Sequence, residues 1–192
     1  MATSDSPAGQ PDPRRPLVFD VSRLGRRPGA MLMIRTEVPS PARIGLELIG
    51  IEPGAQLDLD LRVESVSEGV LVSGTVRAPT RGECSRCLGA VHGDVAIELT
   101  ELFAYPDSVT EATTEEDEVG HVVDQTVDLL QPIVDAVGLV LPFAPLCSAD
   151  CPGLCPQCGV ALATAEPGHR HEQIDPRWAK LAGMVPPEAP GP

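Results

Sequence analysis

Aromatic residues are scarce in this sequence, which has one tryptophan, one tyrosine and three phenylalanines among 192 residues. A buried core must therefore come mainly from Val, Leu, Ile and Ala. No apolar run reaches the roughly 20 residues that a membrane-spanning helix needs. The first residues also lack the apolar stretch of a secretory signal. We therefore expect a cytoplasmic protein with an aliphatic core.

Basic residues are also few, and only one of them is a lysine. Acids outnumber bases by 28 to 14, and the resulting net charge of −14 argues against a broad surface for nucleic acid. Arginines are nevertheless concentrated near the start, where "SRLGRRPG" (22–29) predicts an exposed basic loop. Residues 106–121 contain an acidic run without Lys or Arg, and they predict a solvated acidic loop.

Recognisable catalytic motifs are absent as well. The sequence contains no phosphate-binding glycine loop, no dinucleotide fingerprint, no G-x-S-x-G nucleophile elbow and no H-E-x-x-H motif. Its carboxylates form no constellation that suggests acid–base chemistry. We therefore expect a protein that is not an enzyme, with no catalytic residues and no small-molecule substrate.

A short apolar run predicts a strand at 17–19, and the pattern further along predicts antiparallel strands at 44–51, 57–66, 70–79 and 94–105, with clear period-two alternation in 44–51 and 57–66. A short turn with a glycine joins the third and fourth of these as a hairpin. In "LDLDLRVESV" (57–66) the leucines, Val63 and Ser65 share the inner face. Apolar residues at helical spacing predict a helix at 129–140, with Asp128 and Gln131 as a capping box and Pro142 after its end.

The expected fold class is therefore α+β: an antiparallel β-sheet with one packed helix and a cysteine-rich, zinc-binding C-terminal module. Residues 1–16 are expected to form a disordered leader, 17–142 the α+β domain, and 143–192 the Cys/His-rich module. A short terminal helix is expected to begin at Asp175, with Pro176 in its first turn.

The six cysteines fall into two groups, "CSRC" (84–87) and "CSADCPGLCPQC" (147–158), and "HRH" (169–171) follows the second. Clustered thiols in a reducing compartment are more often metal ligands than disulfides. Zinc takes four Cys or His ligands in a tetrahedron. We therefore predict one or two structural Zn²⁺ ions. The predicted ligands are Cys84, Cys87, Cys147, Cys151, Cys155, Cys158, His169 and His171.

Two pairing schemes are compatible with the spacing. In the favoured scheme Cys155, Cys158, His169 and His171 form a local site, and by elimination 84/87 pair with 147/151. The alternative joins the two C-x2-C pairs, 84/87 with 155/158, and leaves 147/151 without evident partners. The two histidines also have a simpler interpretation as exposed loop residues, and the cysteines as buried free thiols. A redox role for Cys84 and Cys87 is a further hypothesis.

The order of these motifs resembles the YceD family of bacterial large-subunit ribosomal RNA accumulation proteins. The resemblance covers about residues 17–181, and "CSRCL" and "LCSADCPGLCPQCG" are its most specific parts. The arginine-rich, lysine-poor composition is similar to the actinobacterial branch. The family often has a second cysteine pair after the C-P-x-C-G motif, where this sequence has "HRH". Imidazole can replace thiolate on zinc, so this departure is compatible with metal binding.

The resemblance implies a role in the synthesis, processing or stability of large-subunit ribosomal RNA, and hence in ribosome assembly. It supplies no catalytic residues. The expected partners are ribosomal RNA, a ribosomal protein or an assembly factor, and no membrane. The alternative hypothesis is a thiol-redox or metal-sensing protein that uses the Cys84/Cys87 pair.

Overall fold

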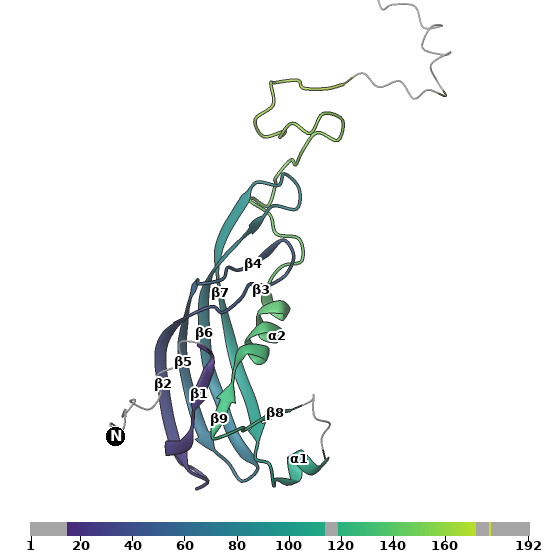
Figure 1. Ribbon diagram of the computed structural model, residues 1–192. Coiled ribbons are helices and arrows are strands. Elements are labelled where there is room, and N and C mark those ends of the chain that lie inside the picture. The colour runs from purple at the N-terminus through teal and green to yellow at the C-terminus, as the bar shows by residue number, and fades with distance from the viewer. Residues whose placement is uncertain (1–14, 114–118, 172–176, 178–192) are drawn as a thin grey trace, which may run out of the picture.

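A long antiparallel sheet forms the body of the protein in the computed structural model, which describes residues 15–113, 119–171 and 177 (Figure 1). The helical elements are a 3-10 helix η1 (Ser22–Leu24), α1 (Val109–Thr113) and α2 (Leu130–Val140). The strands are β1 (Val18–Asp20), β2 (Met31–Pro39), β3 (Ile44–Gly45), β4 (Ile49–Ile51), β5 (Gln56–Ser65), β6 (Gly69–Glu83), β7 (Ala90–Ala104), β8 (Gly120–His121) and β9 (Thr126–Asp128).

Strand β6 organises the sheet. It pairs with β7 along one edge, and on the other edge with β5 and then with β4. Strand β2 extends the sheet beyond β5, and β3 beyond β4. All of these pairs are antiparallel; β8 pairs with the end of β7 in parallel. The expected hairpin is therefore confirmed, as the β5–β6 pair that joins Ser65 to Val70 across a short turn.

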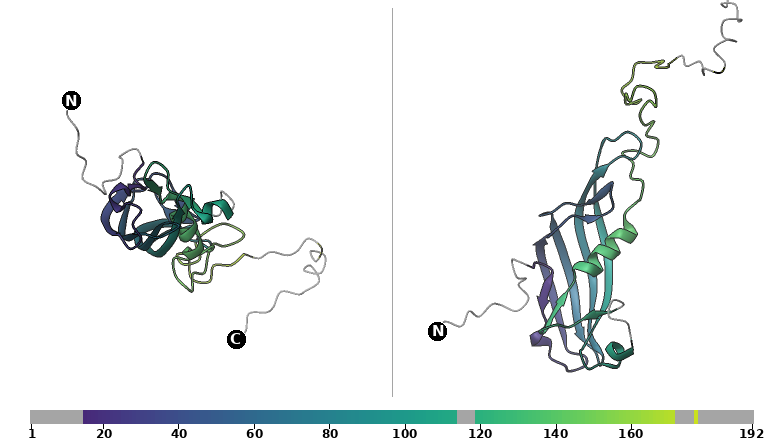
Figure 2. Two further views of the ribbon diagram at one scale, coloured as in Figure 1. Left: turned by 90° about the horizontal axis from the view of Figure 1, so that it is seen from below. Right: turned by 45° about the vertical axis from the view of Figure 1, so that its right-hand side comes forward.

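One face of this sheet carries the core. Alternate residues of β5 from Leu57 to Ser65 are fully buried, and those between them are exposed or half-buried. Helix α2 and the two-stranded β1–β9 ribbon lie over the buried face (Figures 1 and 2). Phe19 of β1 and Ile133 of α2 have no exposed surface. The mostly aliphatic core of the sequence prediction is confirmed, and none of the helices in the described residues has the length and apolar composition needed to cross a membrane.

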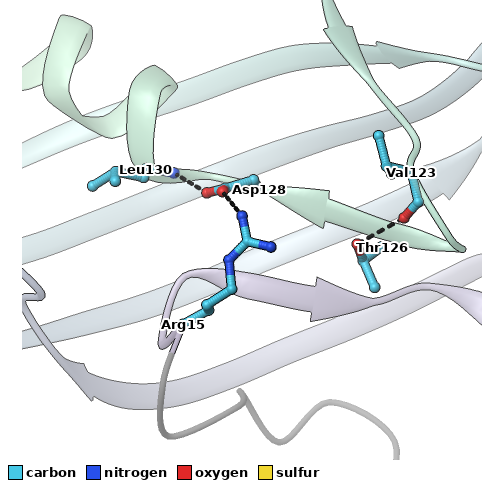
Figure 3. A network of polar contacts seen from close by, with 5 residues as sticks. All are labelled: Arg15, Val123, Thr126, Asp128 and Leu130. Atoms are coloured by element: carbon cyan, nitrogen blue, oxygen red, sulfur yellow. Dashed lines mark hydrogen bonds and ion pairs between the residues drawn. The ribbon is translucent and has the colours of Figure 1, made fainter.

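The start of α2 differs from the predicted capping box. The Asp128 carboxylate accepts a hydrogen bond from the Leu130 backbone N–H at 3.0 Å, and it forms an ion pair with Arg15 at 3.2 Å (Figure 3). Gln131 does not reach back; its amide donates to Asp135 at 2.8 Å instead. Asp128 therefore acts as a one-sided cap, and the ion pair ties it to the start of the described chain.

Replacing Asp128 by alanine is expected to lower the free energy of unfolding by about 1 kcal/mol, because a helix N–H loses its acceptor. Arg15→Ala removes only an exposed ion pair and should cost less than about 0.5 kcal/mol. Urea unfolding of both variants measures the difference. Equal losses would mean that the ion pair, and not the cap, supports the helix.

Several segments differ from the sequence prediction. Residues 44–51 are not one strand but the tight β3–β4 hairpin, because Gly45 and Gly50 bring the two backbones so close that a Cβ at Gly45 would lie 2.7 Å from the Gly50 Cα. The 106–121 loop contains α1 and β8. Strands β2 and β9 were not predicted, and β6 and β7 are longer than the predicted strands at 70–79 and 94–105. Most of the expected leader, the centre of the acidic loop and nearly all of the expected terminal helix lie outside the described residues.

Candidate metal centres

The first cluster joins two segments that are far apart in the sequence. Cys84 and Cys87 belong to the β6–β7 connection, and Cys147 and Cys151 follow α2. Their four sulfur atoms all lie within 4.8 Å of one another. Cys84 and Cys151 are buried, Cys87 is half-buried and Cys147 is exposed. The group therefore lies at the end of the sheet, with one side open to solvent.

The sulfur separations match a tetrahedral metal site. The Cys84 and Cys151 sulfurs are 3.8 Å apart, and those of Cys87 and Cys147 are 3.6 Å apart. Four sulfurs at 2.3 Å from a zinc ion would be about 3.8 Å from one another. A disulfide would instead bring two sulfurs to about 2.05 Å. The geometry thus fits four separate thiolates around one ion.

Backbone contacts hold the two segments together independently of the sulfurs. The Ser85 N–H donates to the Pro145 carbonyl at 2.8 Å, and the Leu154 N–H donates to the Arg86 carbonyl at 3.1 Å. The Arg86 guanidinium donates to the Cys151 carbonyl at 3.0 Å. Sequence reasoning did not identify Arg86, because an arginine between two ligands has no signal of its own. Its contacts make it the main link between the two segments.

The surroundings of Cys84 favour its thiolate form. Backbone N–H groups of Cys147 and then of Cys87 direct their hydrogen bonds toward it and lower its pKa to about 6. The pKa of Cys147 shifts in the other direction, because hydrogen bonds with the Cys151 and Cys87 sulfurs raise it to about 12. The Cys84 thiolate therefore lies beside a protonated Cys147 thiol, whose proton a bound cation would displace.

The second cluster is local. The Cys158 sulfur lies 3.5 Å from Nε2 of His169 and 3.2 Å from Nε2 of His171, and the two Nε2 atoms are 3.1 Å apart. Cys155 completes the group within 4.8 Å. Around zinc, the expected separations are about 3.6 Å for sulfur to nitrogen and about 3.3 Å for nitrogen to nitrogen. This donor set also fits a tetrahedral ion.

The two C-x2-C turns have the same backbone geometry. The Leu88 N–H donates to the Cys84 carbonyl at 2.9 Å, and the Gly159 N–H donates to the Cys155 carbonyl at 2.8 Å. In both turns the residue after the second cysteine is left-handed, with φ of 58° at Leu88 and 72° at Gly159. Glycine adopts this conformation without strain, whereas leucine does not. As in the first turn, backbone N–H groups, here of Gln157 and then Cys158, lower the pKa of the first cysteine, Cys155, to about 6.

The structure thus groups all eight predicted ligands, and it groups them as the favoured pairing scheme does. The alternative that joins the two C-x2-C pairs does not agree with this arrangement. The residues that sequence reasoning missed are those that shape the turns, namely Arg86, Leu88 and Gly153. A Cβ at Gly153, which has φ of 80°, would meet the Arg86 carbonyl oxygen at 3.2 Å.

Comparison with known proteins identifies the family of this chain. The family model described as large ribosomal RNA subunit accumulation protein YceD matches residues 72–184, a span that contains both clusters. The chain belongs to the YceD family. The YceD family name implies a role in the accumulation of large-subunit ribosomal RNA.

The mycobacterial relatives extend the match to nearly the whole chain. Uncharacterized proteins of Mycobacterium tuberculosis and Mycobacterium bovis are each 69% identical over 189 residues, which cover 98% of this chain and 91% of the relative. An uncharacterized protein of Mycobacterium leprae is 64% identical over 175 residues, or 91% of this chain and 80% of the relative. No solved structure matches the chain.

Proposed function

We propose that the protein is a non-catalytic, zinc-stabilised factor that supports the synthesis, processing or stability of large-subunit ribosomal RNA during ribosome assembly. The near-tetrahedral cluster of four sulfurs is the observation on which the proposal mainly rests. It would fasten the segment after α2 to the end of the sheet. The YceD family name supplies the biological process.

Two zinc ions fit the two donor sets. Cys84, Cys87, Cys147 and Cys151 would hold one, and Cys155, Cys158, His169 and His171 the other. Each set offers four protein ligands and so leaves no open position for a water or a substrate, as is typical of structural zinc. A bound ion would fix the relative positions of the two C-x2-C turns and their partners.

The proposal also includes two surfaces through which the protein would contact its partners. Arg23, Arg26 and Arg27 are exposed on the basic loop, at the end of the sheet opposite the clusters (Figure 1). They suit ribosomal RNA, and the acidic segment after β7 suits a basic ribosomal protein or an assembly factor. Closed metal sites and partner contacts of these kinds need no catalytic group.

Zinc content tests the metal part of the proposal. Elemental analysis of untagged protein should give two zinc ions per chain, and one in each of the variants Cys84→Ser and Cys158→Ser. The double variant should have none. One ion that disappears in both single variants would show a shared site, and an absence of zinc in the wild type would overturn the metal assignment.

Controlled depletion in cells tests the non-catalytic role. A stoichiometric factor should limit large-subunit ribosomal RNA in proportion to its own amount, whereas an enzyme should sustain the process until only a small fraction remains. Quantification of large-subunit RNA against protein level distinguishes the two. An unchanged RNA level after complete depletion would contradict the proposed function itself.

The thiol-redox alternative rests on the lowered pKa of Cys84. A thiolate is the reactive form of cysteine. The sulfur has no exposed surface, however, and a reagent would need the cluster to open first. Thiol labelling before and after zinc chelation separates the two functions: labelling of Cys84 and Cys87 in the fully metallated protein would favour the redox function.

A further inference from the structure

A cavity of about 350 Å³ lies beneath the basic loop, at the end of the sheet far from the clusters. Val70 and Val122 contribute apolar surface to it, and Arg26, Tyr105, Asp124 and Gln125 contribute polar groups. Small-molecule and nucleotide sites typically combine an apolar lining with a few polar groups in this way. The volume is at the lower end for such sites and suits a ligand the size of one nucleoside.

The Arg26 side chain is held in place at this cavity. Its guanidinium carbon lies 4.6 Å from the centroid of the Tyr105 ring, and Nη1 donates to the Asp107 carboxylate at 2.9 Å. Tyr105 is itself fixed, because it is buried and its hydroxyl lies 3.1 Å from the buried Ser65 hydroxyl. A guanidinium positioned in this way is a surface on which an unpaired base can stack.

The lining of the cavity also includes a tight turn with left-handed residues. Asp124 and Gln125 are consecutive left-handed residues, with φ of 48° and 59°. The turn is closed by hydrogen bonds between Val123 and Thr126, one of which uses the Thr126 hydroxyl (Figure 3). Such a turn normally uses Asn-Gly or Asp-Gly, so Asp124 suits its position, whereas Gln125 stands where glycine is usual. Non-glycine residues in this conformation often mark functional sites. Both residues are exposed, so packing in the core does not account for their presence.

The turn and the basic loop are also connected. The Val21 N–H, at the start of the loop, donates to the Gln125 carbonyl at 2.8 Å. The turn therefore keeps a fixed position relative to the arginines. Both parts of the cavity lining are positioned by the fold before any ligand arrives.

The charges around the cavity restrict the class of ligand. Arg23 and Arg27 are exposed on the same loop as Arg26 and favour an anion, whereas Asp124, which is among the residues that line the cavity, favours a group that donates hydrogen bonds. A simple anion would be repelled by Asp124, and a basic peptide by the arginines. A nucleotide satisfies both, because it has a phosphate at one end and hydrogen-bond donors on the edge of its base.

We propose that this cavity binds one unpaired nucleotide of RNA, with its base stacked on Arg26 and its flanking phosphates against Arg23 and Arg27. Guanine is the favoured base, because its Watson–Crick edge presents two adjacent N–H donors to the Asp124 carboxylate. This inference rests on the proposed function, and it specifies how the protein would contact ribosomal RNA directly.

Fluorescence anisotropy with labelled octauridylate, and with the same probe carrying one central guanine, tests the proposal. The wild type should bind the guanine probe about tenfold more tightly, and Asp124→Asn should remove this preference. Asparagine tolerates the left-handed conformation, so the turn should be kept. Arg26→Ala should weaken binding of both probes about tenfold or more. Arg35→Ala, an exposed ion-paired arginine on the outer face of β2, is the matched control and should leave binding unchanged.

A wild type without guanine preference, or an Arg26→Ala variant that binds like Arg35→Ala, would overturn the cavity assignment. The same variants, expressed in cells that lack the wild-type protein, separate this result from the proposed function. Normal large-subunit RNA with Asp124→Asn and Arg26→Ala would exclude the cavity and leave the proposed function intact. Normal RNA in cells with no copy of the protein would exclude the proposed function as well.

Discussion

The Cys84→Ser variant is expected to lower the midpoint of thermal unfolding by about 10 °C or more, because the first cluster fastens two segments 60 residues or more apart. A bound ion stabilises the folded chain only if the ligands come together on folding, and here the β6–β7 connection and the segment after α2 meet only in the folded state. Differential scanning calorimetry of the zinc-loaded protein measures the shift.

Cys158→Ser is the matched control, because it removes a ligand of the second cluster by the same chemical change. None of the described residues beyond Leu141 belongs to the hydrophobic core, so loss of the second ion should move the main transition by less than about 3 °C. Chelation of the wild type should reproduce the Cys84→Ser midpoint, and added zinc should not restore that variant. Equal midpoints for the wild type and Cys84→Ser would show that the first cluster does not fasten the fold.

Local patterns in the sequence were sufficient for the second cluster and for most of the sheet. Cys155, Cys158, His169 and His171 lie within 17 residues, so their spacing alone predicted the group. The first cluster followed only by elimination, because nothing near Cys84 in the sequence indicates that the chain after α2 passes beside it. That proximity results from the sheet and from the direction of α2.

Strand β2 shows why alternation fails as a signal when both faces of a strand are apolar. "MLMI" at its start places Met31 and Met33 on the outer face, where both are more than half exposed, and Ile34 on the inner face. The contrast between alternate residues that identified β5 is therefore absent. The cavity beneath the basic loop could not be predicted from the sequence either, because Tyr105 and Asp124 are single residues that only the fold brings together.

Ile133→Ala is expected to have the second large effect, a loss of about 3 kcal/mol in the free energy of unfolding. Ile133 has no exposed surface and packs from α2 toward the sheet, so its truncation leaves a cavity that a helix fixed at both ends cannot readily fill. Urea unfolding with a constant m-value would give this difference directly.

Leu139 on the same helix provides the control, because 88% of its surface is exposed. Leu139→Ala removes the same number of side-chain carbons as Ile133→Ala and should change stability by less than about 0.5 kcal/mol. Comparable losses for the two variants would mean that α2 is not packed on the sheet as described. In that case α2 would not hold the segment that carries Cys147 and Cys151 beside the β6–β7 connection. The four sulfurs of the first cluster would then come together only when an ion binds them.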